Sequence, residues 1–327
     1  MINQKNIKES IDLLEPMSKE SKLIVYKTKD GKKIQFPFCL IKGKGPGPTI
    51  CITAGIHGCE YSSIAAAIKF FKELKPEIVS GTIKIITISN LPAFENRTMF
   101  VCPVDNKNLN GIFPGKEDGS YSEILVYKLF NEFIKDSDYY IDLHGGDMVE
   151  NVTPFSFFHK SGNNDIDENS KELAEFYGLP NIMITTSRGI YPDLGYTYAC
   201  ASENGIPALM AEVGGIGKLE DEDIKMHLKG LYNVLKHIGC LDENPNKNEG
   251  LIYYNKYVWI KTKTKGIFYS KRKLGDEINK DDELGIVKDY FGNEKEIIKA
   301  PFTGKILCLT TSPAMKEKGQ IMAIGGI

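Results

Sequence analysis

The sequence predicts an α/β protein with a doubly wound, mostly parallel sheet, followed by a small all-β domain. Between residues 22 and 238, short apolar strands alternate with amphipathic helices, which is typical of a parallel sheet built from βαβ units. After residue 250, short apolar runs broken by turns rich in Gly and Asp replace the helices. With a polar linker at 241–250, we expect a larger domain over 1–245 and a small β domain, barrel- or sandwich-like, over 251–327.

The amino-terminal part of the chain predicts a hairpin and then a βαβ unit. The apolar runs KLIVYKT and IQFPFCLIKG flank Asp30-Gly31, a dipeptide suited to hairpin turns. PTICITAG and GTIKIITIS are rich in apolar and β-branched residues without strict alternation, as expected of strands buried on both faces. A helix from about Tyr61 to Leu74 connects these two strands.

The helix–strand alternation then repeats three times. The segments SEILVYKLFNEFIKD, SKELAEFYGL and GYTYACASENG read as helices, and each precedes a strand, which is YYIDLHGG, NIMITT or PALMAEVGG respectively. A last amphipathic helix runs from about Glu222 to Ile238. Open parallel sheets bind their ligands at the carboxyl ends of the strands, so we expect the functional residues there.

Composition and charge favour a small-molecule partner. The 41 basic and 43 acidic residues are mixed along the chain and give a net charge of -2, without the basic stripe that nucleic acid or an anionic membrane attracts. The amino-terminal residues show no secretory signal, no segment has the apolar length of a membrane span, and the seven cysteines form no CxxC pair. We expect a cytoplasmic protein and leave a homo-oligomer open.

Three potential metal ligands follow two of the predicted strands. His57, in ITAGIHGCE, comes after one strand, and Glu60 lies three residues later where a helix begins, so both side chains share a helical face. His144 ends the strand YYIDLH. Two histidines and a glutamate, with one position left for water, are typical of catalytic zinc. The sequence predicts one Zn²⁺ per chain, although the His57–Glu60 spacing alone also fits an ordinary histidine beside a helix-start carboxylate.

Two further carboxylates lie at strand ends. Asp142 shares a strand face with His144 and is placed to accept a hydrogen bond from its imidazole, which would fix the tautomer; the alternative is an aspartate that only ends a strand. Glu212 follows mainly apolar residues and precedes two glycines. Burial would raise its pKa and zinc would lower it, giving a group that exchanges protons. The alternative for Glu212 is an exposed strand-end glutamate.

The segment 89–115 contains too many turn-forming residues for regular structure, and long loops commonly carry function. Arg97 could polarise a substrate carbonyl or stabilise an oxyanion, and Asn110 could hydrogen-bond a substrate carboxylate. Arginine occurs only at Arg97, Arg188 and Arg272, so an arginine in this loop is a functional candidate. A structural ion pair is the alternative role for Arg97.

The other histidines and loops predict no further site. His159 lies in an aromatic strand, and His227 and His237 lie on the polar or boundary face of the last helix, so we expect none of them to bind a metal. The chain has no GxxxxGK[ST] loop and no strand-linked GxGxxG, which disfavours a phosphate-binding loop.

These motifs together resemble the succinylglutamate desuccinylase/aspartoacylase family, a branch of the zinc carboxypeptidase superfamily, over nearly the whole chain. The matching pieces are GIHGCE, NLPAFENR, VDNKNLNGIFPG, DLHGG and AEVGG. The resemblance implies zinc held by His57, Glu60 and His144, with Glu212 as the catalytic glutamate and Arg97 as the loop arginine. It also implies an α/β domain followed by a small β domain, and hydrolysis of an N-acyl amide.

One position departs from the family pattern. Gly111 stands where the family usually has an arginine that grips the substrate carboxylate, in an NLNR or DLNR motif. Either Arg188, in TTSRGIY, makes that contact, or the substrate lacks a carboxylate there. Within the family, NLNGIFPG, DYFGN and APFTGKI resemble deacylases of N-acylated diamino acids.

The sequence therefore predicts a zinc-dependent hydrolase that cleaves a linear amide bond of a small N-acyl amino acid or N-acyl amine. Metal-activated water attacks the carbonyl near Arg97, and Glu212 takes the proton and passes it to the leaving amine. A carboxypeptidase-like peptidase is one alternative. A metal-binding protein with a decayed site is another, with Gly111 as its first sign. A lipoyl-like carrier role for the carboxyl-terminal domain is a third, although no lysine there lies in a recognisable modification motif.

Overall fold

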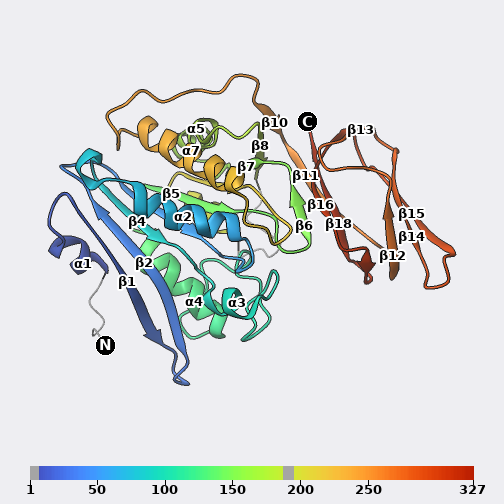
Figure 1. The fold of residues 1–327 in the computed structure, drawn as a ribbon, viewed down its shortest axis with the longest axis horizontal. Coiled ribbons are helices and arrows are strands. Elements are labelled where there is room, and N and C mark those ends of the chain that lie inside the picture. Colours follow the sequence, from blue (N-terminus) through green and yellow to red (C-terminus); the bar gives the residue numbers. More distant parts are fainter. Residues whose placement is uncertain (1–6, 187–194) are drawn as a thin grey trace.

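The computed structural model describes residues 7–186 and 195–327 and contains one large sheet and two smaller ones (Figure 1). The large sheet has nine strands in the order β1-β2-β4-β3-β5-β9-β7-β8-β10. These strands are β1 (Ser18–Lys27), β2 (Lys33–Lys42), β3 (Thr49–Ala54), β4 (Thr82–Ile86), β5 (Tyr139–His144), β7 (Phe155–His159), β8 (Asn181–Thr185), β9 (Ala208–Glu212) and β10 (Ile252–Tyr254).

The predicted doubly wound, mostly parallel architecture is confirmed. Strand β3 runs parallel to β4 and β5, β5 to β9, and β8 to β7 and β10. Antiparallel pairing joins β1 to β2, β2 to β4, and β7 to β9. The β1–β2 hairpin turns at Gly31, whose φ of 82° suits glycine. The central strands β3, β5 and β9 are therefore parallel neighbours, and their carboxyl ends lie at one edge of the sheet.

Helices cover both faces of this sheet. Helices α2, α5 and α7 pack together on one face (Figure 1), and α4 and α6 lie on the other. The helices are α1 (Ile7–Leu13), α2 (Tyr61–Glu73), α3 (Leu91–Asn96), α4 (Tyr121–Leu129), α5 (Asn164–Tyr177), α6 (Thr197–Glu203) and α7 (Asp221–His237), with a 3₁₀ turn η1 (Pro76–Ile78) and a π-helical turn η2 (Phe130–Ile134) that continues α4. Of the helices in the described ranges, none is both long and apolar enough to cross a membrane.

The alternation of side chains along β5 decides which face carries the polar residues. Ile141 and Leu143 pack into the core under α2, α5 and α7, whereas Tyr140 packs into the core on the other face. Successive side chains of a strand point to opposite faces, so Asp142 and His144 lie on the face of Tyr140. Asp142 and His144 therefore lie on the face of the large sheet that α4 and α6 cover.

The segment 89–115 is not wholly irregular, because it contains helix α3. The Asn90 side chain accepts a hydrogen bond from the Ala93 backbone amide, and Pro92 lies in the first turn. An Asn cap followed by Pro is a helix-start signal. The expectation of no regular structure was therefore wrong at 91–96, and the helix ends at Arg97, whose φ is 48°.

The carboxyl-terminal region is antiparallel β structure, as predicted, and the described residues 251–327 include no helix. One sheet has the order β11-β18-β16-β13 and the other β15-β14-β12-β17. The strands are β11 (Lys256–Lys261), β12 (Gly266–Ser270), β13 (Glu277–Ile278), β14 (Glu283–Lys288), β15 (Glu294–Lys299), β16 (Gly304–Thr310), β17 (Ala314–Met315) and β18 (Gln320–Gly326).

Strands β6 (Glu150–Val152) and β10 connect the two regions. Strand β6, from the segment after His144, pairs with β16 of the carboxyl-terminal sheet. Strand β10, which follows the predicted linker, pairs with β8 of the large sheet. The predicted domain boundary near residue 250 stays a prediction, but the pairing of β6 fixes a segment beside His144 against the carboxyl-terminal sheet.

Candidate metal and catalytic site

The carboxyl ends of β3, β5 and β9 bring the predicted site residues together. His57 and Glu60 lie in the short connection between β3 and α2, and His144 is the last residue of β5. Glu212 is the last residue of β9 and is the register partner of His144. Because β5 lies between β3 and β9, the four residues occupy one edge of the sheet, as the parallel topology requires.

The three predicted metal ligands converge on one point. Nδ1 of His57 lies 2.6 Å from Glu60 Oε1, and Nδ1 of His144 lies 2.9 Å from Glu60 Oε2. Potential ligand atoms of these three residues lie within 4.8 Å of one another. Glu60 and His144 are buried, while the side chain of His57 is 13% exposed. The group therefore borders solvent on the side of His57.

Hydrogen bonds to the far nitrogens orient both imidazoles. Nε2 of His144 donates to Asp142 Oδ2 at 3.0 Å, and Nε2 of His57 donates to Asn108 Oδ1 at 3.0 Å. In the neutral form of each imidazole, which is the form that binds a metal, Nδ1 would then carry its lone pair on the side of Glu60. The buried Nδ1 of His144 makes no hydrogen bond despite its closeness to the carboxylate, and an unpaired buried nitrogen is costly. A metal ion would satisfy both lone pairs and the carboxylate, so the residues present fit one.

The electrostatics of the group also require positive charge. Burial alone would raise the pKa of Glu60, yet the His144 and His57 imidazoles hold it at about 2. Burial would lower the pKa of His57, but Glu60 raises it to about 9. For His144, Glu60 and Asp142 likewise overcome burial and raise the pKa well above its ordinary value. The Glu60 carboxylate thus stays charged, and a proton or a metal ion has to neutralise it.

Hydrogen bonds fix the Asp142 carboxylate, which in turn orients His144. Its Oδ1 accepts a hydrogen bond from Thr53 Oγ1 at 2.7 Å, and its Oδ2 accepts one from Thr197 Oγ1 at the start of α6. The carboxylate is fully buried. Carboxylates that bind the outer nitrogen of a ligand histidine fix its tautomer and raise its basicity. The hydrogen bond to His144 agrees with the role predicted for Asp142, and that role stays a prediction.

We expect Asp142→Asn to weaken metal binding while preserving the side-chain volume. The amide carries no negative charge, so it orients the His144 imidazole less firmly, and the apparent affinity for a divalent metal ion should fall roughly 10–100-fold. Competition with a chromogenic chelator measures this affinity. Asp118→Asn is the matched control, because Asp118 is exposed and pairs with Lys29 at the surface. Equal affinity of the Asp142→Asn and wild-type proteins would contradict the role.

Glu212 stands beside the ligands as a carboxylate without a fixed partner. It is half-buried and lies in register between His144 on β5 and Phe155 on β7. Burial raises its pKa to about 8, with Glu60 and Glu150 adding to the effect and His144 opposing it. Within the described ranges, its carboxylate forms no hydrogen bond or ion pair. It is therefore free to exchange a proton.

The residues predicted to contact substrate have different surroundings. Arg97 is exposed, and its guanidinium forms no ion pair in the part of the chain that the structure describes. Asn110 is buried, and its side chain accepts a hydrogen bond from Thr197 N at 3.1 Å and donates one to Met210 Sδ at 3.5 Å. Arg188 lies outside the described residues. The substrate roles of Arg97, Asn110 and Arg188 stay predictions.

His227 was misplaced by the sequence, and Asn108 was missed. His227 is fully buried rather than on a polar or boundary face; its Nε2 donates to the His144 carbonyl at 3.1 Å, and its Nδ1 accepts from Tyr177 O–H at 2.7 Å. Buried groups from other elements satisfy the His227 imidazole, and the periodicity of its own helix does not reveal them. Asn108 lies in the irregular part of 89–115, where only the NLN pattern could have indicated it.

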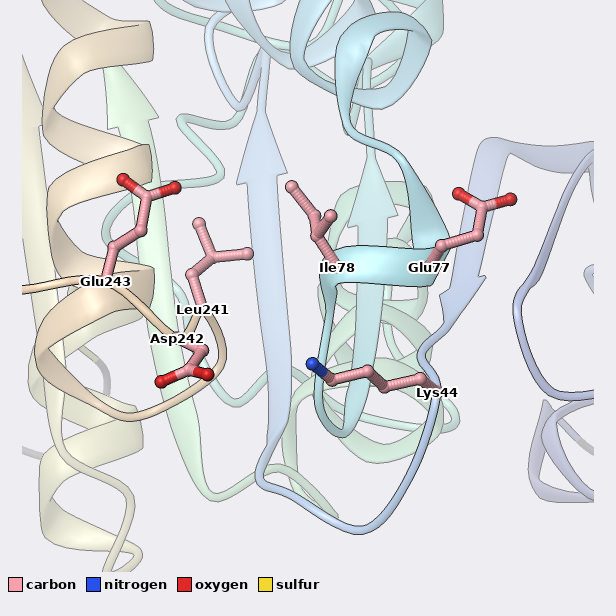
Figure 2. Close-up of a pocket in the computed structure, with 6 residues that line it drawn as sticks. All are labelled: Lys44, Glu77, Ile78, Leu241, Asp242 and Glu243. Atoms are coloured by element: carbon pink, nitrogen blue, oxygen red, sulfur yellow. The ribbon is translucent and has the colours of Figure 1, made fainter.

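A separate surface pocket of about 190 Å³ lies away from this site (Figure 2). Lys44 comes between β2 and β3, and Glu77 comes just before β4, so the pocket lies at the amino ends of the parallel strands. Its lining residues are Lys44, Glu77, Ile78, Leu241, Asp242 and Glu243. Its lining includes carboxylates but no histidine, whereas His57, Glu60, His144 and Glu212 lie at the opposite edge of the sheet.

Comparison with known proteins agrees with this arrangement. The model of the succinylglutamate desuccinylase/aspartoacylase catalytic domain matches residues 46–238. This span is more than half of the chain and contains His57, Glu60, His144 and Glu212. The chain belongs to this family. The resemblance seen in the sequence is thereby confirmed, and membership makes the protein an amide-hydrolysing enzyme.

Individual relatives cover most of the chain. An N-alpha-acetyl-L-2,4-diaminobutyric acid deacetylase of Halomonas elongata is 28% identical over 263 residues, which are 78% of this chain and 75% of that protein. A succinylglutamate desuccinylase/aspartoacylase structure from Rhodobacter sphaeroides has a TM-score of 0.81 at 21% identity, covering 94% of this chain and 95% of that one. The product-bound ectoine utilization protein of Ruegeria pomeroyi has a TM-score of 0.82 at 21% identity, covering 96% and 98%. The two structures show a shared fold.

Proposed function

We propose that the protein is a zinc-dependent hydrolase that cleaves the amide bond of a small N-acyl amino acid or N-acyl amine. The observation that carries the proposal is the unpaired, buried Nδ1 of His144, which faces the Glu60 carboxylate together with Nδ1 of His57. Two nitrogens and a carboxylate that leave one position free are typical of catalytic zinc. The similarity to a deacetylase supports the reaction class.

We assign the proton transfers to Glu212. When bound, zinc lowers the pKa of a coordinated water and polarises the substrate carbonyl. Glu212 accepts the proton of the attacking water as the oxygen–carbon bond forms, and it donates that proton to the amine nitrogen as the carbon–nitrogen bond breaks. Added positive charge beside Glu212 lowers its pKa from about 8, which ionises the carboxylate near neutral pH. Arg97 supplies positive charge for the carbonyl oxygen.

A substrate panel tests the function. We expect the zinc-loaded protein to release free amine from one or more of the N-acetyl, N-succinyl and other N-acyl amino acids and amines, and to contain about one zinc per chain. Amine release is measured by derivatisation and metal content by plasma mass spectrometry. Turnover of peptides alone would point to a carboxypeptidase-like peptidase. Failure to hydrolyse any acyl amide would contradict the proposal.

We also propose a cytoplasmic location. Six cysteines of the described part of the chain are buried and form no disulfide: Cys39, Cys51, Cys59, Cys102, Cys240 and Cys308. Proteins of oxidising compartments commonly pair their cysteines in disulfides. These six buried thiols therefore support a reducing compartment.

A further inference from the structure

Glu150 is a carboxylate beside the site that the proposed mechanism does not use. It begins β6, the strand by which the segment after His144 joins the carboxyl-terminal sheet. We propose that Glu150 binds a free ammonium group of the substrate, so that the enzyme prefers N-acylated diamines and diamino acids to acyl amines without a second nitrogen. This inference rests on the proposed function and names the substrate class of the same site.

The backbone of Glu150 is fixed against both catalytic strand ends. Its amide donates to the Asp147 carbonyl at 2.9 Å, and its carbonyl accepts from the Ile216 amide at 2.7 Å. A Cβ atom on Gly146 would lie only 2.3 Å from the backbone carbonyl oxygen of Glu150, and a Cβ atom on Gly215 would lie only 2.4 Å from the same oxygen. The glycine pairs that follow His144 and Val213 thus leave room for this close approach. Both strand ends and Glu150 are therefore positioned by one rigid set of contacts.

The Glu150 side chain lacks a counter-charge. It is half-buried, and among the described residues no side chain forms a hydrogen bond or ion pair with it; only the Asp147 backbone amide contributes. Burial raises its pKa to about 7, the Glu60 carboxylate adds to this effect, and the His57 imidazole opposes it. Buried carboxylates are ordinarily paired. A cationic group of a ligand would supply the direct partner that the Glu150 side chain lacks among the described residues.

Asp147, in the same segment, differs from Glu150 because backbone amides donate hydrogen bonds to both of its carboxylate oxygens. Its Oδ2 accepts from the Phe100 amide at 2.8 Å, and its Oδ1 accepts from the Met148 amide at 2.6 Å. Asp147 is fully buried, whereas Glu150 keeps some exposure. Asp147 therefore organises the loop, and Glu150 is the carboxylate that remains available to a ligand.

The charge of the site favours an ammonium group on the substrate over a second carboxylate. Glu60, Glu212 and Glu150 influence one another electrostatically. Metal binding and proton transfer occupy the first two, so the negative charge of Glu150 is left over. A carboxylate attracts an ammonium and repels a second carboxylate, which is how charge selects between substrates.

Gly111 fits this preference. It occupies the position where the family usually carries an arginine that grips a substrate carboxylate. The position is open, because the nearest atom to a Cβ built there is the Asn108 carbonyl oxygen at 4.0 Å. Packing therefore does not require glycine at this position, and the missing guanidinium removes attraction for an anionic substrate group.

Buried aromatic side chains pack next to Glu212. Phe155 is the register partner of Glu212. The ring of Tyr257, from β11 of the carboxyl-terminal sheet, lies 6.1 Å from the Phe155 ring and 5.2 Å from the Phe157 ring. This packing holds the carboxyl-terminal sheet against the strand ends that carry Glu212 and Glu150.

The test compares two substrates of nearly equal size on the zinc-loaded full-length protein. N-alpha-acetyl-L-2,4-diaminobutyrate carries a free ammonium, and N-acetyl-L-2-aminobutyrate lacks it. We expect the wild type to prefer the substrate with the ammonium group by about 30-fold or more in kcat/KM. In Glu150→Gln the preference should be lost because KM for that substrate rises, whereas KM for the substrate without the ammonium should not rise. Asp242→Asn, which removes an exposed carboxylate of the distant pocket, should keep the wild-type preference.

Product binding gives a readout that does not depend on turnover. Calorimetry should show that L-2,4-diaminobutyrate binds the wild type about 30-fold more tightly than L-2-aminobutyrate, and that Glu150→Gln binds both equally. Glu150→Asp, which keeps the charge, should retain part of the difference. If Glu150→Gln does not fold, the comparison of Glu150→Asp with the wild type decides, because a difference between the two ligands that is unchanged in Glu150→Asp would place the ammonium site elsewhere.

Three results would overturn the inference. A wild type that hydrolyses both substrates without preference would remove the ammonium site, and a preference that persists in Glu150→Gln would place it elsewhere. Loss of kcat for both substrates alike would show that Glu150 acts in the chemical step. Failure of the proposed function has a different outcome, in which the wild type hydrolyses neither these substrates nor any other acyl amide.

Discussion

The Glu212→Gln protein should retain its zinc and lose turnover by roughly 10²–10⁴-fold in kcat. Glutamine has almost the same shape as glutamate, but its amide neither accepts the proton of the attacking water nor returns it to the leaving amine. Glu212 lies outside the group of His57, Glu60 and His144 that fits a metal. The substitution therefore separates proton transfer from metal binding.

Steady-state kinetics and metal analysis of the same preparation measure both effects of Glu212→Gln. Glu277→Gln is the matched control, because Glu277 is exposed on β13 of the carboxyl-terminal sheet. Burial raises the pKa of Glu212 to about 8, so its ionised form is unfavourable in the folded protein and the neutral amide should not destabilise the fold. Full activity of Glu212→Gln would remove the assigned role.

The grouping of the candidate metal ligands with Glu212 could be predicted because each residue is tied to a local pattern. His57, His144 and Glu212 follow apolar strands, and parallel topology brings the carboxyl ends of such strands together. Asp142 follows from the same logic, since it lies two residues before His144 on one strand face. Local motifs and strand periodicity were therefore sufficient for this part of the site.

Glu150 and His227 could not be predicted in this way, because their environments depend on residues far away in the sequence. Strand β6 has only three residues, too few for a periodic pattern, and its pairing with β16 is set by tertiary packing. His227 is buried because Tyr177 and the His144 carbonyl satisfy its imidazole. Periodicity predicts which face of a helix is apolar, but it does not predict which buried polar groups of other elements will hydrogen-bond to a side chain on that face.

Removing the metal should abolish hydrolysis, and its return should depend steeply on pH. In the metal-free protein, Glu60 raises the pKa of His57 to about 9 against the effect of burial, and the pKa of His144 also lies well above its ordinary value. Both imidazoles have to be neutral to bind a metal, so binding displaces protons. Below about pH 9, falling pH therefore weakens zinc binding, by about tenfold per pH unit for each proton released.

Chelation and calorimetry check this pH dependence. Dialysis against a chelator should eliminate activity, and added zinc should restore it. Zinc titrations in buffers of different ionisation enthalpy count the protons released, and we expect about one to two at neutral pH. The proton count should fall as the pH approaches about 9, because His57 is then losing its proton before zinc arrives. Activity that survives chelation would contradict the mechanism, and a zinc affinity that does not change between about pH 6 and about pH 8 would contradict the protonated state of the free ligands.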